Sequence, residues 1–243
     1  MFKVIVKKNY EEVSDAAFEV FQPVMEKEYP VLGLATGSSP VGLYQRMIKD
    51  HKENGTSYAN AVSFNLDEYV GLPRQHKESY YTFMHENLFN HIDIKEQNTH
   101  VPNGETTNPE QECMDYENAL KQVSVDVQIL GIGSDGHIAF NEPGASFDSE
   151  THVMELTQQT RQDNARFFDG DINQVPTLAI TQVLASIMRA KKIILVATGA
   201  NKAEAVKGMI EGEKTVDCPA SILQDHADVT VILDEAAASA LSR

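Results

Sequence analysis

The chain of 243 residues is 42% hydrophobic and carries a formal net charge of −16, which argues against non-specific binding to nucleic acid or to an anionic membrane. No apolar run approaches the ~20 residues that span a bilayer, and lysines interrupt the N-terminal apolar segment too early for a signal peptide. Cys113 and Cys218 lie far apart without a metal-binding spacing, so we expect free thiols and a cytoplasmic protein.

Short apolar segments alternate with longer segments of helical periodicity along the chain. The expected strands are Val4–Val6, Val31–Ala35, Ala61–Leu66, Val125–Leu130, Ile193–Thr198 and Val229–Leu233. The expected helices are Tyr10–Lys27, Pro40–Glu53, Ser79–Phe89, Glu110–Val123 and Lys202–Glu211. This alternation predicts a Rossmann-like α/β fold, an open and mostly parallel sheet with helices on both faces. We expect a single domain over residues 1–243, with a less regular flap or insertion at about 143–191.

Four of these strands are followed by polar loops. The loops are Thr36–Pro40, Asp67–Gly71, Gly131–Pro143 and Gly199–Lys202. In open α/β sheets ligands bind beyond the carboxyl ends of the strands, where such loops meet. The four loops together therefore predict one functional site.

The loop Gly131–Pro143 contains a histidine between two carboxylates, in the order Asp135, His137 and Glu142. Carboxylates orient the ring and favour its charged form, so this set suits proton transfer near neutral pH. The loop also matches the Gly-x-Gly-x-x-Gly pattern of dinucleotide-binding folds, but Pro143 follows too soon for the long helix that this motif requires. A metal site is disfavoured, because catalytic zinc and iron sites usually contain two or three imidazoles.

The loop Thr36–Pro40 combines Thr36, Gly37, Ser38 and Ser39 with the start of a helix, where free N–H groups attract anions. A plain helix cap at Ser39, with Pro40 as the first helical residue, explains the same residues equally well. No lysine follows in the P-loop arrangement, so a nucleotide site is not expected.

Two acids, Asp67 and Glu68, follow an expected buried strand directly. Burial raises the pKa of a carboxyl group and suits it to abstract a proton, so one of the two is expected to act as a base. Lys202, at the start of a helix, could pair with a phosphate, although an isolated lysine is more often solvated. Arg161 and Arg166 are both candidates for a second cation, and the pattern alone does not choose between them.

The chain resembles the glucosamine-6-phosphate deaminase family from about Val31 to about Leu233. The resemblance is carried by four segments, Leu32–Pro40, Asn65–Gly71, Gly133–Pro143 and Asn164–Phe168. The related 6-phosphogluconolactonases share the Asp-Gly-His core but have a Leu-Phe-Pro type ending where this chain has Asn141-Glu142-Pro143.

The resemblance implies that glucosamine 6-phosphate and water are converted to fructose 6-phosphate and ammonia without a metal or organic cofactor. His137, oriented by Asp135 and Glu142, would open the sugar ring, and Asp67 would carry the C2 proton to C1. The phosphate would bind the Thr36–Ser39 loop. Arg166 and Lys202 would be its cations, and Glu68 is expected to contact the substrate.

The resemblance also bears on regulation and assembly. Members regulated by an N-acetylated sugar phosphate have basic residues where this chain has Thr151-His152-Val153-Met154, and they have an extended C-terminus. We therefore expect an unregulated enzyme, with a monomer favoured and a homo-oligomer possible. Two alternatives are a lactonase and the sugar-phosphate sensor of a transcription regulator, but this acidic chain has no segment for the DNA-binding module that a sensor needs.

Overall fold

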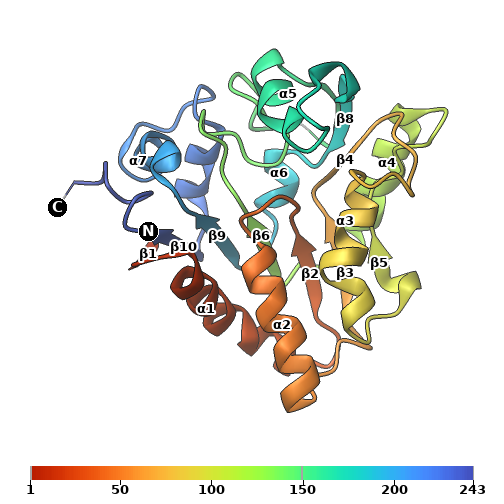
Figure 1. Cartoon of the computed structure of the whole chain (residues 1–243), viewed down its shortest axis with the longest axis horizontal. Coiled ribbons are helices and arrows are strands. Elements are labelled where there is room, and N and C mark those ends of the chain that lie inside the picture. The colour runs from red at the N-terminus through yellow and green to blue at the C-terminus, as the bar shows by residue number, and fades with distance from the viewer. Residues whose placement is uncertain (1, 149, 243) are drawn as a thin grey trace.

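The computed structural model describes residues 2–148 and 150–242, and within them a seven-stranded sheet forms the centre of the fold (Figure 1). Its strand order is β1-β10-β9-β6-β2-β3-β5, and every neighbouring pair is parallel. The strands are β1 (Lys3–Lys7), β2 (Val31–Leu34), β3 (Val62–Asn65), β5 (Thr99–His100), β6 (Val127–Leu130), β9 (Ile193–Ala197) and β10 (Val229–Asp234). The predicted parallel α/β fold is confirmed, and of these strands only β5 was not predicted.

Helices cover both faces of this sheet. One face carries α1 (Tyr10–Phe21), α2 (Val41–Asn54) and α3 (Tyr80–Asn87), and the other carries α4 (Pro109–Lys121), α6 (Leu184–Ile187) and α7 (Ala203–Glu211). Alternate residues of a strand point to opposite faces. In β9, Ile194 and Val196 therefore pack in the core beneath α1 and α2, whereas Ile193 and Leu195 pack beneath α6 and α7.

The helix boundaries follow local chemistry. Asn108 caps α4, since its side chain accepts a hydrogen bond from the Gln111 N–H, and Pro109 is the first helical residue, as predicted. The helix predicted over Tyr10–Lys27 is too long, because α1 ends at Phe21 and a 3₁₀ turn, Gln22–Glu26, follows with Pro23 at its start.

A second, three-stranded antiparallel sheet lies beyond the carboxyl ends of the central strands (Figure 1). It consists of β4 (Asp67–Tyr69), β8 (Leu178–Thr181) and β7 (His152–Glu155), and α5 (Gln158–Ala165) packs beside it. One expectation is thereby corrected, since Asp67–Tyr69 is a short strand rather than a loop. The segment 143–191 contains β7, α5, β8 and α6, and several of its apolar side chains pack in a small core with Tyr69, Leu72 and Phe140.

The order of the strands determines where a ligand can bind. From β2 the chain proceeds outward through β3 to β5, and from β6 it proceeds in the opposite direction through β9 to β10. The boundary between β2 and β6 is therefore the topological switch point, where open α/β sheets place their ligands. None of the helices in the described residues is long and apolar enough to span a membrane.

Candidate active site

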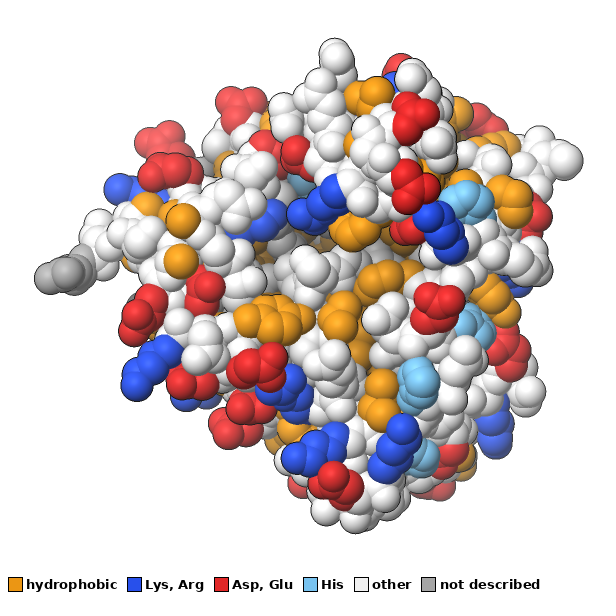
Figure 2. All heavy atoms as spheres, viewed as in Figure 1, with side chains coloured by type: hydrophobic (Ala, Val, Ile, Leu, Met, Phe, Trp, Pro, Cys, Tyr) orange, Lys and Arg blue, Asp and Glu red, His pale blue; other side chains and the backbone are white. Residues whose placement is uncertain are grey.

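A cavity of about 360 Å³ opens at this switch point, within the ~300–1,000 Å³ range of small-molecule sites. Figure 2 shows a hollow at the centre of this face, with basic side chains at its edge. The four predicted polar loops all contribute to the lining, together with α3 and the residues before it, the segment around α5 and the ends of central strands. From the loops come Thr36, Gly37, Ser38, Ser39, Asp67, Gly131, Gly133, His137 and Lys202.

His137 lines the pocket, and Asp135 lies beside it outside the lining. The His137 Nδ1 atom lies 2.7 Å from Asp135 Oδ1, and the same oxygen accepts the backbone N–H of His137 at 3.1 Å. Burial by itself would raise the pKa of Asp135, but the hydrogen bond and charge of His137 lower that pKa to about 2. Asp135 is therefore ionised at neutral pH and orients the imidazole.

The glycines of this loop make room for the imidazole. Residue Gly133 lies so close to the ring that a Cβ atom there would come within 2.2 Å of the His137 Nδ1 and Cε1 atoms. The Gly133 N–H also donates to the His137 carbonyl at 2.8 Å, which folds the loop back on itself. No helix begins between residues 131 and 143, all of which the structure describes, so the dinucleotide-binding pattern here is coincidental.

Glu142 approaches the same imidazole from the interior. Its side chain is 6% exposed, and its Oε2 atom lies 3.7 Å from His137 Nδ1. Its Oε1 atom accepts hydrogen bonds from the hydroxyls of Thr160 and Thr157, which belong to the first turn of α5 and its cap. The structure therefore brings Asp135, His137 and Glu142 together, as the sequence predicted.

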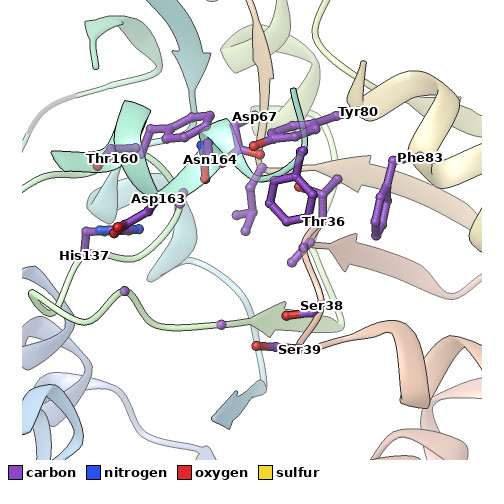
Figure 3. A pocket seen from close by; sticks show the side chains of 18 of the residues that line it. Thr36, Ser38, Ser39, Asp67, Tyr80, Phe83, His137, Thr160, Asp163 and Asn164 are labelled. Atoms are coloured by element: carbon purple, nitrogen blue, oxygen red, sulfur yellow. The ribbon is translucent and has the colours of Figure 1, made fainter. Parts of the chain in front are cut away.

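Asp67 also lines the pocket, beside Tyr80 and apart from His137 (Figure 3). The residue is 6% exposed, and no described residue donates a hydrogen bond to its carboxyl group. Burial, reinforced by the adjacent charge of Glu68, raises the pKa of Asp67 to about 8. A carboxyl group in this environment is a strong base when it is ionised.

Glu68 points away from the cavity and is not part of its lining. Its carboxylate accepts the backbone N–H groups of Tyr69 and Tyr80 at Oε1 and of Tyr81 at Oε2, at 2.9 to 3.0 Å. Burial raises the pKa of Glu68 to about 7, against the lowering effect of these hydrogen bonds and of Arg74. The geometry therefore gives Glu68 a role in holding the start of α3, and it does not support the predicted substrate contact.

The loop before α2 keeps its polar groups available. Pro40 occupies the cap position of α2 without a side-chain hydrogen bond, so Ser39 is not the cap and α2 begins at Val41. The hydroxyls of Thr36, Ser38 and Ser39 have no hydrogen-bond partner among the described residues, and all three side chains line the pocket. Gly37 provides the turn with a φ of +86°. The loop can therefore surround an anion.

The two arginine candidates lie in different places. Arg161 donates to the carbonyls of Ile172 and Val175 inside the segment that follows α5, whereas Arg166 lines the pocket. Lys202 lines the pocket as well, and its pKa is lowered by burial and by the nearby charge of Arg166. Because two cations repel each other, their proximity at a cavity wall favours an anionic ligand.

Asp135, His137 and Glu142 together are called the relay below. Their side chains could also surround a metal ion, since one ligand atom from each lies within 4.8 Å of the others. However, the Nδ1 atom that would bind the metal already faces Asp135 at 2.7 Å. The donor set contains one imidazole, fewer than the usual catalytic zinc or iron sites. The arrangement therefore fits a proton relay better than a metal centre.

Several lining residues were not predicted from the sequence. Thr160, Asp163 and Asn164 enter from α5, and the amide of Asn164 donates to the Tyr69 hydroxyl at 2.9 Å. Tyr80 enters from α3, where its ring stacks with Phe140. The Asn164–Phe168 segment was singled out only as part of the family resemblance. The hydrogen bond between Asn164 and Tyr69 joins residues far apart in the chain, so local periodicity gives no signal for it.

Comparisons with known proteins agree with this geometry. The family model described as glucosamine-6-phosphate isomerases/6-phosphogluconolactonase matches residues 8–232. Glucosamine-6-phosphate deaminase of Thermoanaerobacter pseudethanolicus is 49% identical over 98% of this chain and 94% of its own, and that of Clostridium perfringens is 48% identical over 98% and 99%.

A solved structure of a monomeric glucosamine-6-phosphate deaminase is 44% identical and covers 98% of this chain and 100% of its own, with a TM-score of 0.96. The 6-phosphogluconolactonase of Trypanosoma brucei has a TM-score of 0.79 at 22% identity, covering 100% and 99%, which shows a shared fold. On the extent of these matches, the chain belongs to the glucosamine-6-phosphate isomerase/6-phosphogluconolactonase family.

Proposed function

We propose that this enzyme converts glucosamine 6-phosphate and water to fructose 6-phosphate and ammonia. The observation that carries the proposal is the buried Asp67 carboxyl group without a hydrogen-bond partner among the described residues, in the same cavity as the His137 relay and the Arg166–Lys202 pair. The near-full-length similarity to several deaminases supports it.

Phosphate binding orients the sugar in this proposal. The hydroxyls of Thr36, Ser38 and Ser39 and the charges of Arg166 and Lys202 surround the phosphate. Arginine can hold a phosphate with two parallel hydrogen bonds, whereas lysine acts as a point charge. The sugar then lies between His137 and Asp67, which both line the cavity (Figure 3).

Ring opening is assigned to His137. The imidazole takes the proton of the C1 hydroxyl and returns a proton to the ring oxygen, while the bond between C1 and that oxygen breaks and an aldehyde forms. Asp135 and Glu142 stabilise the transient imidazolium and hold it in position.

Isomerisation and deamination are assigned to Asp67. Its carboxylate removes the C2 proton, which the new aldehyde makes acidic, while the C1 oxygen takes a proton from the C2 ammonium group, and a neutral enolamine forms. Return of that proton to C1 gives a ketimine at C2, and addition of water there releases ammonia and leaves the ketone. Because the substrate carries an ammonium group at C2, binding also lowers the pKa of Asp67 and ionises the base.

The test is to mix the purified protein with glucosamine 6-phosphate and to measure ammonia and fructose 6-phosphate together. Equal amounts of both products are expected. If no ammonia is released, the proposal is wrong, and 6-phosphogluconolactone is the next substrate to test, because a lactonase binds a related sugar phosphate but needs no base at C2.

We also propose that the enzyme is monomeric and unregulated by N-acetylglucosamine 6-phosphate. The similarity to a deaminase described as monomeric supports the first point. For the second, the segment Thr151–Met154 lacks the basic residues of regulated relatives, and Thr151 itself is buried against Glu117. Monomeric elution in gel filtration and a hyperbolic rate curve that the effector leaves unchanged are expected.

A further inference from the structure

Glu142 depends on α5 for its orientation. The side chain is buried, and within the described residues its only hydrogen bonds come from two hydroxyls, those of Thr160 and Thr157, both at Oε1. The Thr157 contact is long, at 3.4 Å, so the short Thr160 contact is the stronger of the two. Its second oxygen, Oε2, has no hydrogen-bond partner in the described part of the chain.

The unpartnered oxygen is the one that faces the relay, 3.7 Å from His137 Nδ1. The two oxygens of a carboxylate are joined rigidly, so a hydrogen bond that fixes Oε1 also fixes the direction of Oε2. Without the Thr160 hydroxyl, the terminal torsion of Glu142, which is intrinsically broad, would be free to turn Oε2 away from the imidazole.

The hydroxyl of Thr160 is itself held in position. Thr160 is 4% exposed and lies in the first turn of α5, where its N–H donates to the Thr157 hydroxyl that caps the helix. The other end of α5 is followed directly by Arg166, which lines the cavity. One helix thus carries both a proposed phosphate ligand and the group that orients Glu142.

We infer that Thr160 is a positioning residue for the proton relay, acting through Glu142 on His137. This inference rests on the proposed function, because the relay is the ring-opening group of that reaction. It predicts that loss of the Thr160 hydroxyl lowers kcat and leaves phosphate binding unchanged, since misplacement of a proton-transfer group by a fraction of an ångström costs rate rather than affinity.

The test compares Thr160→Val, which keeps the shape but removes the hydroxyl, with Thr160→Ser, which keeps the hydroxyl. For Thr160→Val we expect a loss of about tenfold in kcat, part of the 10²–10⁴-fold that general acid–base catalysis supplies. The inhibition constant of inorganic phosphate should stay within about twofold, and Thr160→Ser should restore most of kcat. If Thr160→Val fails to fold, as judged by its melting temperature, Thr160→Ala replaces it in the same comparison.

The matched control is Thr151→Val. Thr151 is also a buried threonine that donates to a buried carboxylate, Glu117 at 2.6 Å, but it lies outside the pocket lining. This variant should lose stability and keep its kcat.

Two results would overturn the inference. One is a Thr160→Val enzyme with wild-type kcat. The other is a kcat loss accompanied by an equal loss of phosphate affinity, which would mean that α5 as a whole had moved Arg166. Failure of the proposed function is distinguishable from both, because the wild-type enzyme would then release no ammonia.

Discussion

Two aspartates of the site, Asp67 in the pocket lining and Asp135 beside His137, show how the surroundings of a carboxyl group decide its chemistry. Asp135 lies at a partly exposed loop beside His137, and its pKa is lowered to about 2. Asp67 is buried at the start of β4, and its pKa is raised to about 8 by burial and by Glu68. The first stays ionised and orients a partner, and the second can exchange a proton near neutral pH.

The two environments arise from different levels of structure. The partner of Asp135 is two residues away in the chain, so a local turn that Gly133 and Gly136 permit is enough to form the pair. Asp67 is buried because β4 pairs with β8 more than a hundred residues later. A change at Asp67 should therefore affect catalysis and stability, whereas a change at Asp135 should mainly affect the relay.

The largest effect is expected for Asp67→Asn. The amide fills the same space but cannot accept the C2 proton, so kcat should fall by about 10³-fold or more. Binding of inorganic phosphate should be unchanged, because Arg166 and Lys202 are untouched. Parallel measurement of Asp135→Asn, which should retain more activity since His137 is still present, completes the comparison. Near-normal turnover of Asp67→Asn would remove Asp67 from the mechanism.

The pH dependence of the rate should sharpen the same contrast. Because Asp67 acts when ionised and its pKa is raised to about 8, kcat/KM should fall about tenfold per pH unit below that value. Asp135, with its pKa near 2, contributes nothing to this limb. In the pH profile of kcat, the acid limb should lie at lower pH than in the profile of kcat/KM, because the ammonium group of the bound substrate favours the ionised form of Asp67.

The substrate also titrates in this range, so a variant is needed to isolate the enzyme's contribution. Glu68→Gln removes the charge that helps to raise the pKa of Asp67, and the acid limb of kcat/KM should shift toward lower pH relative to wild type. An acid limb at the same pH in both enzymes would assign it to the substrate.

The sequence predicted the half of the site that depends on local patterns. Short apolar strands and the polar or glycine-rich loops that follow them placed His137, Asp135 and the Thr36–Ser39 loop together at one edge of the sheet. The roles of Glu68 and Thr160 were beyond such reasoning. Glu68 contacts the backbone of Tyr80 and Tyr81, twelve and thirteen residues away. Thr160 contacts Glu142 eighteen residues away, with the strand β7 between them in the chain.

The small antiparallel sheet was missed for a related reason. Its strands β4, β7 and β8 are three or four residues long, and one of them follows β3 almost directly. A strand of that length gives too few residues for an alternating pattern, so long-range pairing rather than local preference determines its existence.

A moderate effect on stability is expected from the titration of Asp67. The folded-state pKa of Asp67 is raised above its unfolded value, so the native state binds a proton that the unfolded chain releases between about pH 4 and 8. Stability contributed by this proton is present at low pH and is lost as the pH rises through 8. Asp67→Asn avoids that loss of stability. Each kcal/mol of unfolding free energy corresponds to about 2–4 °C in Tm for a chain of this size.

Thermal melts at about pH 6 and about pH 9 test this linkage. The Tm of Asp67→Asn should exceed that of wild type by several degrees at the higher pH and by less at the lower. A difference that does not grow with pH would show that Asp67 is not the buried titrating group. The matched Asp135→Asn variant should give no such increase, since the pKa of Asp135 is shifted in the opposite direction.

The smallest effect is expected from removal of metal ions. In the relay, His137 Nδ1 faces Asp135 Oδ1 at 2.7 Å, so a metal ion at the same atoms would have to break that contact. Dialysis against EDTA should therefore leave the rate unchanged. Added Zn²⁺ should inhibit, because imidazole and carboxylate are ligands that zinc prefers, and EDTA should reverse the inhibition. Loss of activity in EDTA, with recovery when one metal is added, would instead make Asp135 and Glu142 metal ligands. The comparison of Asp135 with Asp67 would then be one between a metal-bound carboxylate and a free one.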